Sequence, residues 1–152
     1  MVIYPEKWVT TMNYRLLSVV FLSLLNTPTT ALAGDFNFGT EISVDRLDKA
    51  IFVLNAKAPN RENAMETITH ASRDGRILVE EITLTSEADN AIHDFSVNKL
   101  KQLLYDATRD RYCDGDMKFL MEGNVSLRLI FSLHQKEFYR VLQTPFSCTI
   151  VN

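Results

Sequence analysis

The chain has 152 residues and a formal net charge of −3 at pH 7, with 16 basic and 19 acidic side chains interleaved along its length. The basic residues form no stripe, which argues against nucleic-acid binding. The sequence has no acidic tail, no low-complexity segment and no internal repeat, so nothing in it indicates a repeat architecture.

Residues 12–33 have the pattern of a secretory signal peptide. Arg15 supplies a basic start, and residues 16–25 form an apolar run of ten. That run is shorter than the roughly 20 residues that a membrane span needs. Ala31-Leu32-Ala33 is a small-residue cleavage site. An uncleaved anchor or a buried helix is the alternative interpretation of this segment.

Cleavage after Ala33 would leave a mature chain of 119 residues, which we expect to form one domain. We predict that it is periplasmic or secreted, without stable membrane insertion, in a bacterium. Residues 1–11 lack the signal pattern, so we interpret them as a non-native extension upstream of an initiator Met12.

Two cysteines, Cys113 and Cys148, lie in the mature part. In an exported chain two cysteines predict one disulfide. The bridge would close a loop of 36 residues. Chain-entropy reasoning gives such a loop a stabilisation of about 3 to 4 kcal/mol. Free thiols, intermolecular pairing or a thiol nucleophile are the alternatives.

The first half of the mature chain predicts a helix and a hairpin. Ser43 is a good N-cap, apolar residues then recur at helical spacing, and Pro59 disfavours helical geometry before it, which predicts a helix over 43–57. Residues 64–73 and 76–85 alternate around Asp74-Gly75, a strong hairpin signal.

The second half predicts two more helical segments and a second strand pair. After a polar connection over 85–93, Ser96 caps a helix that ends at Cys113, and residues 117–121 add a short helical turn. Near the end of the longer helix, Arg109 and Arg111 suit the helix macrodipole. The predicted strands that follow are 125–133, then 137–142 continuing at 146–151. Pro145 interrupts the last strand and indicates a sheet edge or a bulge.

These elements predict an α+β fold with the order α-β-β-α-(short α)-β-β. We expect a single two-layer domain, with an antiparallel sheet and its helices on one face. The disulfide would then join the end of the second helix to the last strand, and so tie the helical layer to the sheet.

From Asn55 to Cys148 the chain resembles a group of small exported bacterial proteins, largely without assigned function. The shared features are a helix ending in Asn55-Ala56-Lys57-Ala58-Pro59, a Thr-rich hairpin, a helix ending in Cys, the segment Met117–Gly123, and a strand pair ending in a second Cys. The chain departs from that pattern at its last turn, where His134-Gln135-Lys136 replaces an Asp-Gly or Asn-Gly. The resemblance implies an exported α+β protein with a helix-to-strand disulfide.

No motif in the sequence supports catalysis or a metal. His70, His93 and His134 lack the spacing of a zinc helix, and the serines lie outside nucleophile motifs. Asp114-Gly115-Asp116, with Asp106 and Asp110 upstream, could bind calcium, but it lacks the alternating ligands of a calcium loop. We therefore predict no enzyme, no metal and no cofactor.

The segment from Met117 to Met121 is the strongest candidate for partner binding. Met117, Phe119, Leu120 and Met121 cannot all share one helical face, and methionine suits an adaptable surface. The alternative is that this segment closes one end of the core. The free sheet edge near Pro145 is a second candidate, through strand addition.

Together these features favour a non-catalytic binding or accessory protein, such as an inhibitor, an immunity protein or an accessory subunit of an envelope machine. Its partner would be another envelope or exported protein. A sensor for a small ligand or lipid, with a pocket between sheet and helices, is the first alternative, and a small hydrolase is the second.

Overall fold

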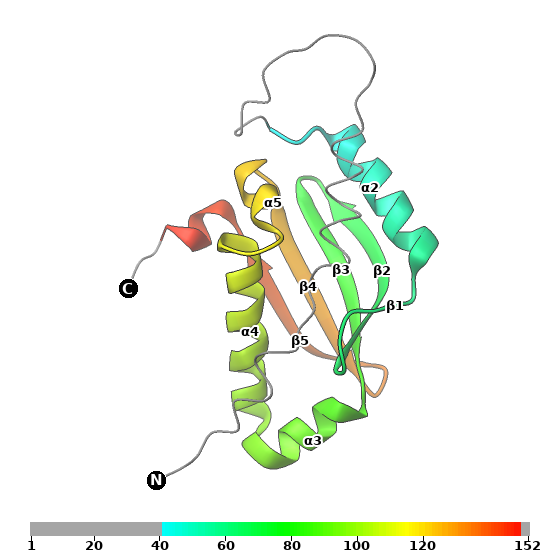
Figure 1. Cartoon of the computed structure of the whole chain (residues 1–152), viewed down its shortest axis with the longest axis vertical. Helices are drawn as coiled ribbons and strands as arrows, with labels where there is room; N and C mark the ends of the chain where they lie inside the picture. The colour runs from blue at the N-terminus through cyan, green and yellow to red at the C-terminus, as the bar shows by residue number, and fades with distance from the viewer. Residues whose placement is uncertain (1–40, 150–152) are drawn as a thin grey trace.

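The computed structural model describes residues 41–149 (Figure 1). The predicted upstream extension 1–11 and signal peptide 12–33 lie outside the described residues. The elements in chain order are α2 (Val44–Lys57), β1 (Asn60–Arg61), β2 (Glu66–Asp74), β3 (Ile77–Leu84), α3 (Ser86–Phe95), α4 (Val97–Cys113), α5 (Lys118–Glu122), β4 (Ser126–Leu133), β5 (Lys136–Gln143) and the short 3-10 helix η2 (Pro145–Cys148). The α+β class is therefore confirmed.

Helix α2 begins and ends where its sequence signals lie. The Ser43 side chain accepts a hydrogen bond from the backbone N–H of Arg46, at 3.4 Å, and Ala58 before Pro59 is extended. Leu47, Ala50 and Leu54 form its buried face. The helix therefore packs one apolar stripe against the sheet, as its periodicity predicts.

Asn55 of α2 forms hydrogen bonds with the backbone at the outer edge of β2. Its side-chain amide donates to the carbonyl of Ala71 at 2.8 Å and accepts from the Ala71 N–H at 2.7 Å. The register of β2 shifts between Ile68 and His70, just before this contact. Asn55 thus supplies the pair of hydrogen bonds that a neighbouring strand would otherwise make.

The sheet is mixed, which corrects the wholly antiparallel sheet expected from the two hairpins. Its order is β1-β2-β3-β4-β5, and every neighbouring pair is antiparallel except β3 and β4. Residues 85–125 carry the chain back across the sheet through helices, so β4 starts at the same end as β3 (Figure 1). The sheet therefore contains two antiparallel hairpins, β2–β3 and β4–β5, whose inner strands β3 and β4 pair in parallel.

Residues 86–95 form helix α3, where a polar connection was predicted. Thr85 accepts a hydrogen bond from the backbone N–H of Glu87, and Ala88, Ala91 and Ile92 face the core. Those three positions have helical spacing, but across residues 86–95 the polar residues outnumber them. The helix therefore forms because its narrow apolar stripe is buried by tertiary packing.

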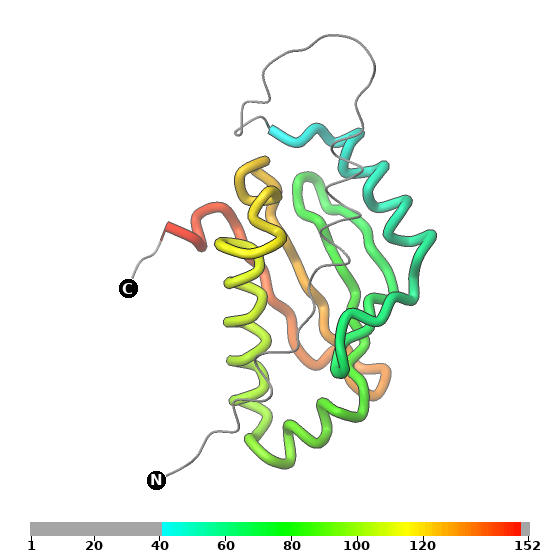
Figure 2. Tube along the Cα trace, in the orientation of Figure 1, coloured from blue at the N-terminus to red at the C-terminus, as the bar shows by residue number. Residues whose placement is uncertain are grey.

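The chain end also differs from the prediction, because η2 replaces the second part of the last strand. Pro145 occupies the first turn of η2, where its missing N–H costs nothing, and Thr144 and Ser147 form a reciprocal cap. Cys148 therefore lies in a short helix and not in a strand. The structure contains the Cys113–Cys148 disulfide, which joins the C-terminal end of α4 to the C-terminal end of η2. Figure 2 shows that α4 runs alongside β5, the strand that precedes η2.

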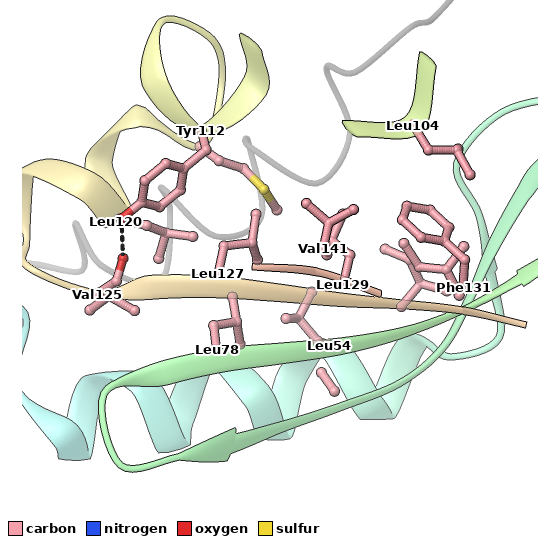
Figure 3. Close-up of a cluster of buried hydrophobic side chains, with 14 of the residues drawn as sticks. Leu54, Leu78, Leu104, Tyr112, Leu120, Val125, Leu127, Leu129, Phe131 and Val141 are labelled. Atoms are coloured by element: carbon pink, nitrogen blue, oxygen red, sulfur yellow. Dashed lines mark hydrogen bonds between the residues drawn. The ribbon is translucent and has the colours of Figure 1, made fainter. Parts of the chain in front are cut away.

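The core lies on one face of the sheet, beneath α2, α4 and α5. Side chains from β3 and β4 meet Leu54 of α2, Leu104 of α4 and Leu120 of α5 in a single cluster. Figure 3 shows Tyr112 of α4 directed toward β4, and its hydroxyl donates to the carbonyl of Val125 at 2.8 Å. None of the helices between residues 41 and 149 has the length and apolarity needed to cross a membrane.

Candidate functional site

The segment proposed for partner binding contributes mainly to the core. Met117 is 4% exposed and Leu120 is fully buried, whereas Phe119 and Met121 are half-buried and pack against the cluster. The short helix is held in place by the backbone N–H of Val125, which donates to the carbonyl of Leu120 at 2.8 Å. A partner contact through this segment remains a prediction, and its accessible part is Phe119 and Met121.

The three histidines are exposed. His70 on β2 is exposed and pairs in register with Glu81 of β3, and His93 is exposed near the end of α3. His134 lies in the β4–β5 turn, where its Nε2 is 2.9 Å from both carboxylate oxygens of Asp89. That contact ties the turn to α3. Among residues 41–149, the carboxylate in contact with His134 is that of Asp89, whereas a hydrolase site was expected to gather a histidine with two carboxylates.

The last turn folds without the expected glycine. His134 and Gln135 both have positive φ, 51° and 62°, as a two-residue hairpin turn requires. The His134–Asp89 contact is formed in this conformation. The departure from the Asn-Gly pattern therefore changes the chemistry of the turn but keeps the hairpin.

The acidic patch after α4 divides between solvent and the interior. Asp106, Asp110 and Asp114 are exposed, whereas the Asp116 side chain is 15% exposed and turns inward, with its Oδ1 3.4 Å from Nε of Arg111. Residues 41–149 contain no group of three His, Cys, Asp or Glu side chains placed to hold a metal ion. The patch is thus a helix terminus from which one carboxylate pairs with a buried arginine.

Five charged side chains interact electrostatically around Arg111, and we call them the buried charged cluster. Its members are Glu62, Glu66, Glu80, Arg111 and Asp116. Each comes from a different part of the chain: the β1–β2 loop, the start of β2, the centre of β3, the last turn of α4 and the α4–α5 loop, in the same order. Segments far apart in the sequence therefore supply one electrostatic unit.

Burial in the cluster is deepest at Glu80. Glu80 is fully buried, Glu66 is 5% exposed and Arg111 is 7% exposed, while Glu62 is half-buried. Asn63 donates to the Glu66 carboxylate at 2.8 Å, and Asn60 donates to Glu62 at 2.9 Å. Within the described part of the chain, neither carboxylate oxygen of Glu80 has a hydrogen-bond partner.

The pKa values of the cluster's glutamates follow from this burial. Burial raises the pKa of Glu80 from 4.5 to about 7, although nearby Arg111 works against that rise. Burial likewise raises the pKa of Glu66 and that of Glu62. Burial opposes the charge on Arg111, but the carboxylates around it, with Asp116 foremost, raise its pKa overall. Glu80 therefore keeps its proton at pH values where a solvated glutamate has released it.

A second buried polar group lies on β5. Gln143 is fully buried on the same side of the sheet as Val141, and neither of its amide atoms has a hydrogen-bond partner among residues 41–149. Its strand neighbour is Leu127 of β4, which also belongs to the core. The covered face of the sheet thus contains two polar side chains without partners of their own.

The buried positions of Glu80 and Arg111 were not predicted from the sequence, although the spacing of apolar residues around each indicates them. Glu80 occupies the phase of β3 that carries Leu78, Ile82 and Leu84, so alternation places it on the apolar face. Arg111 follows Leu100, Leu104 and Thr108 at helical spacing on α4. Arg111 lies in the last turn of α4, as predicted, but its burial was not predicted.

The fold is similar to those of solved bacterial proteins. The chain is similar to a pilotin of the type 2 secretion system, EpsS from Vibrio vulnificus, with a TM-score of 0.55 and 18% identity over 67% of this chain and 87% of that one. It is also similar to AspS, the type II secretion system pilotin from Vibrio cholerae, with a TM-score of 0.51 and 18% identity over 67% of this chain and 88% of that one.

A third similar structure is a candidate secreted protein from Pseudomonas aeruginosa, with a TM-score of 0.52 and 15% identity over 78% of this chain and 98% of that one. No protein-family model and no curated protein sequence matches the chain. At these identities the similarity establishes a shared fold. The resemblance to small exported bacterial proteins is consistent with it.

Proposed function

We propose that this chain is a non-catalytic accessory protein of a secretion machine in the bacterial envelope. The observation that carries the proposal is the fold, which matches two type II secretion pilotins over 87% and 88% of their lengths. The similarity spans nearly the whole of those proteins, so it is more than a shared hairpin or helix pair. Fold alone does not dictate function, so the residues must supply further support.

The compartment supports the same role. A signal peptide cleaved after Ala33 would deliver the chain to the periplasm, where the Cys113–Cys148 disulfide can form and persist. Intact mass of protein purified from the periplasm tests this, with and without reductant and alkylation. We expect a mass that starts at Gly34 and thiols that alkylate after reduction alone. A mass retaining residues 12–33 would contradict the assignment.

The described residues also give more support to binding than to catalysis. The three histidines are exposed, whereas Glu80, whose pKa is raised to about 7, is fully buried. A hydrolase would need a nucleophile or activated water beside a base in a reachable cleft. We therefore infer that the chain acts by holding another envelope protein.

Deletion of the gene in its own host tests the function. We expect proteins that normally leave the cell through the type II machine to accumulate in the periplasm, and export to return when the wild-type chain is supplied. Unchanged export by a working type II system would overturn the proposal.

A photoreactive residue in place of Met121 tests the predicted contact segment in the same cells. Met121 is half-buried at the surface of α5, and Phe52 on α2, which is 75% exposed, is the control position. We expect Met121, and not Phe52, to give an adduct that mass spectrometry identifies as a component of the secretion machine. Equal adducts at both positions, or none at Met121, would exclude this segment as the contact.

A further inference from the structure

Glu80 is a carboxylic acid at the centre of the sheet with its hydrogen-bonding capacity unused. It is fully buried, and both its oxygens lack a partner among residues 41–149. A buried polar group without a partner is costly, and a buried charge without one costs more. An Ala or Leu would avoid that cost in this phase of β3, so the position calls for a ligand.

The charges around Glu80 are unbalanced. Within the described residues, the cluster brings four carboxylates, those of Glu62, Glu66, Glu80 and Asp116, to one guanidinium, that of Arg111. Asp116 already pairs with Arg111 through its Oδ1, and its Oδ2 is buried without a partner. A second positive charge beside these carboxylates would offset the cost of burying them in ionised form.

The chemistry of the donors favours an organic cation over a metal ion. The carboxylates come from separate elements and do not converge as a metal-ligand set in the described chain. An ammonium or guanidinium group carries several N–H donors that can reach oxygens pointing from different directions. Glu62, half-buried, and Asp116, whose side chain is 15% exposed, are the members of the cluster that solvent reaches most easily.

We propose that the buried charged cluster is a binding site for an organic cation, whose ammonium or guanidinium N–H groups donate hydrogen bonds to Glu80 and to its carboxylate neighbours. The cation comes either from a small amine or from a lysine or arginine side chain of a polypeptide. Both sources offer the same chemistry, and the experiment below separates them.

The test is a titration of the exported protein with n-butylammonium chloride, followed by NMR of the Glu80 carboxyl carbon. Tetramethylammonium chloride is the matched control, because it has the same charge but no N–H donor. We expect a saturable shift with n-butylammonium and none with tetramethylammonium at equal ionic strength. The same response to both salts would mean charge screening and would overturn the proposal.

Two neighbouring residues of β3 provide the variant and its control. Glu80→Gln keeps the shape of the side chain and removes the charge, and Glu81→Gln does the same on the exposed opposite face. We expect Glu80→Gln to weaken binding about 10- to 100-fold, the effect of losing a charged hydrogen-bond partner, and Glu81→Gln to leave it unchanged. For these variants, binding is followed through backbone amide shifts.

Glu66→Gln, in which Asn63 can still contact the side chain, gives a second measurement in the cluster. We expect weaker binding there as well. Equal binding by wild type, Glu80→Gln and Glu66→Gln would overturn the site.

A peptide arm identifies the source of the cation. A capped alanine-rich peptide with one central lysine is compared with the same peptide carrying norleucine. Tighter binding of the lysine peptide than of n-butylammonium would assign the site to a polypeptide side chain, and the reverse order would assign it to a small amine. If neither n-butylammonium nor the lysine peptide binds better than its control, the proposal is wrong.

Discussion

The two faces of the sheet follow one alternating sequence pattern but differ in how deeply their side chains are buried. On the helix-covered face, Leu78, Ile82, Leu127, Leu129 and Phe131 are at most 2% exposed. On the open face, the intervening Glu81 and Thr83 are exposed, and Arg128, Ile130 and Ser132 are half-buried. In β3 and β4, alternation therefore assigns the faces even where it places a charge in the apolar phase, as at Glu80, although Val79 in the open-face phase is also buried.

The largest expected effect comes from removing an aromatic side chain from the covered face. Phe131→Ala should lower the free energy of unfolding by about 3 to 5 kcal/mol, because it deletes a buried ring and leaves a cavity. Ile130→Ala, one residue away on the open face, should cost clearly less because that side chain is only half-buried. Urea unfolding of both variants measures the difference, and equal losses would contradict the assignment of faces.

The same alternation explains how much of the fold could be predicted from sequence. Helix α2, the two hairpins, α4 and α5 were all predicted within a few residues, because each has a clear apolar period or a clear cap. Helix α3 was missed because Ala88, Ala91 and Ile92 make a weak stripe, and η2 was taken for a strand because Phe146–Val151 is rich in apolar and β-branched residues. The parallel β3–β4 pairing depends on the direction of a long helical connection, which no local pattern records.

The next effect separates the two neighbouring glutamates of β3. The pKa of Glu80 rises from 4.5 to about 7 in the folded protein, so the folded state binds a proton that the unfolded state releases between these pH values. The associated stability is fully present below pH 4.5 and is lost as the pH rises through about 7. Glu80→Gln cannot ionise, so it should be more stable than wild type by about 3 kcal/mol at pH 8 and similar to it below pH 4.5.

Urea unfolding across pH 4 to 8 measures this profile, and Glu81→Gln, exposed on the open face, is the control that should follow wild type. The groups that face Glu80 are Glu62, Glu66, Arg111 and Asp116. Since the pKa values of Glu62 and Glu66 are also raised, part of the slope should remain in the Glu80→Gln protein. A Glu80→Gln profile that parallels wild type throughout would contradict the burial of an acid at this position.

The cluster itself could not be predicted in the way the helices were. Each member, taken alone, has an ordinary surface explanation: Arg111 near a helix end, Asp116 in a turn, Glu62 in a loop. Their association depends on the packing of α4 over the sheet and on the inward turn of the α4–α5 loop. Glu80 and Arg111 each have a sequence signal for burial: Glu80 lies between Leu78 and Ile82 in an otherwise apolar phase, and Arg111 lies on the buried stripe of α4.

A smaller effect is expected where helix and sheet edge meet. Asn55→Ala removes both hydrogen bonds to Ala71 and leaves its N–H and carbonyl partly buried without those partners. The loss should be about 2 kcal/mol, the cost of unsatisfied backbone groups. Asn55→Asp keeps the acceptor for the Ala71 N–H and loses the donor to the Ala71 carbonyl. Its free energy of unfolding should therefore lie between those of wild type and Asn55→Ala. Hydrogen exchange should show faster exchange of the Ala71 amide in Asn55→Ala, and unchanged protection there would show that the edge is sealed in another way.

The smallest effect isolates one hydrogen bond on the covered face. Tyr112 is fully buried, and its hydroxyl donates to the carbonyl of Val125 at the start of β4. Tyr112→Phe keeps the ring in the core and removes that donor, so the expected loss is about 1 kcal/mol. Tyr105→Phe, on the exposed side of α4, is the matched control and should be nearly neutral. A loss comparable to that of Phe131→Ala would mean that the hydroxyl organises the entry of β4, and that the covered face depends on its few polar contacts as much as on its apolar area.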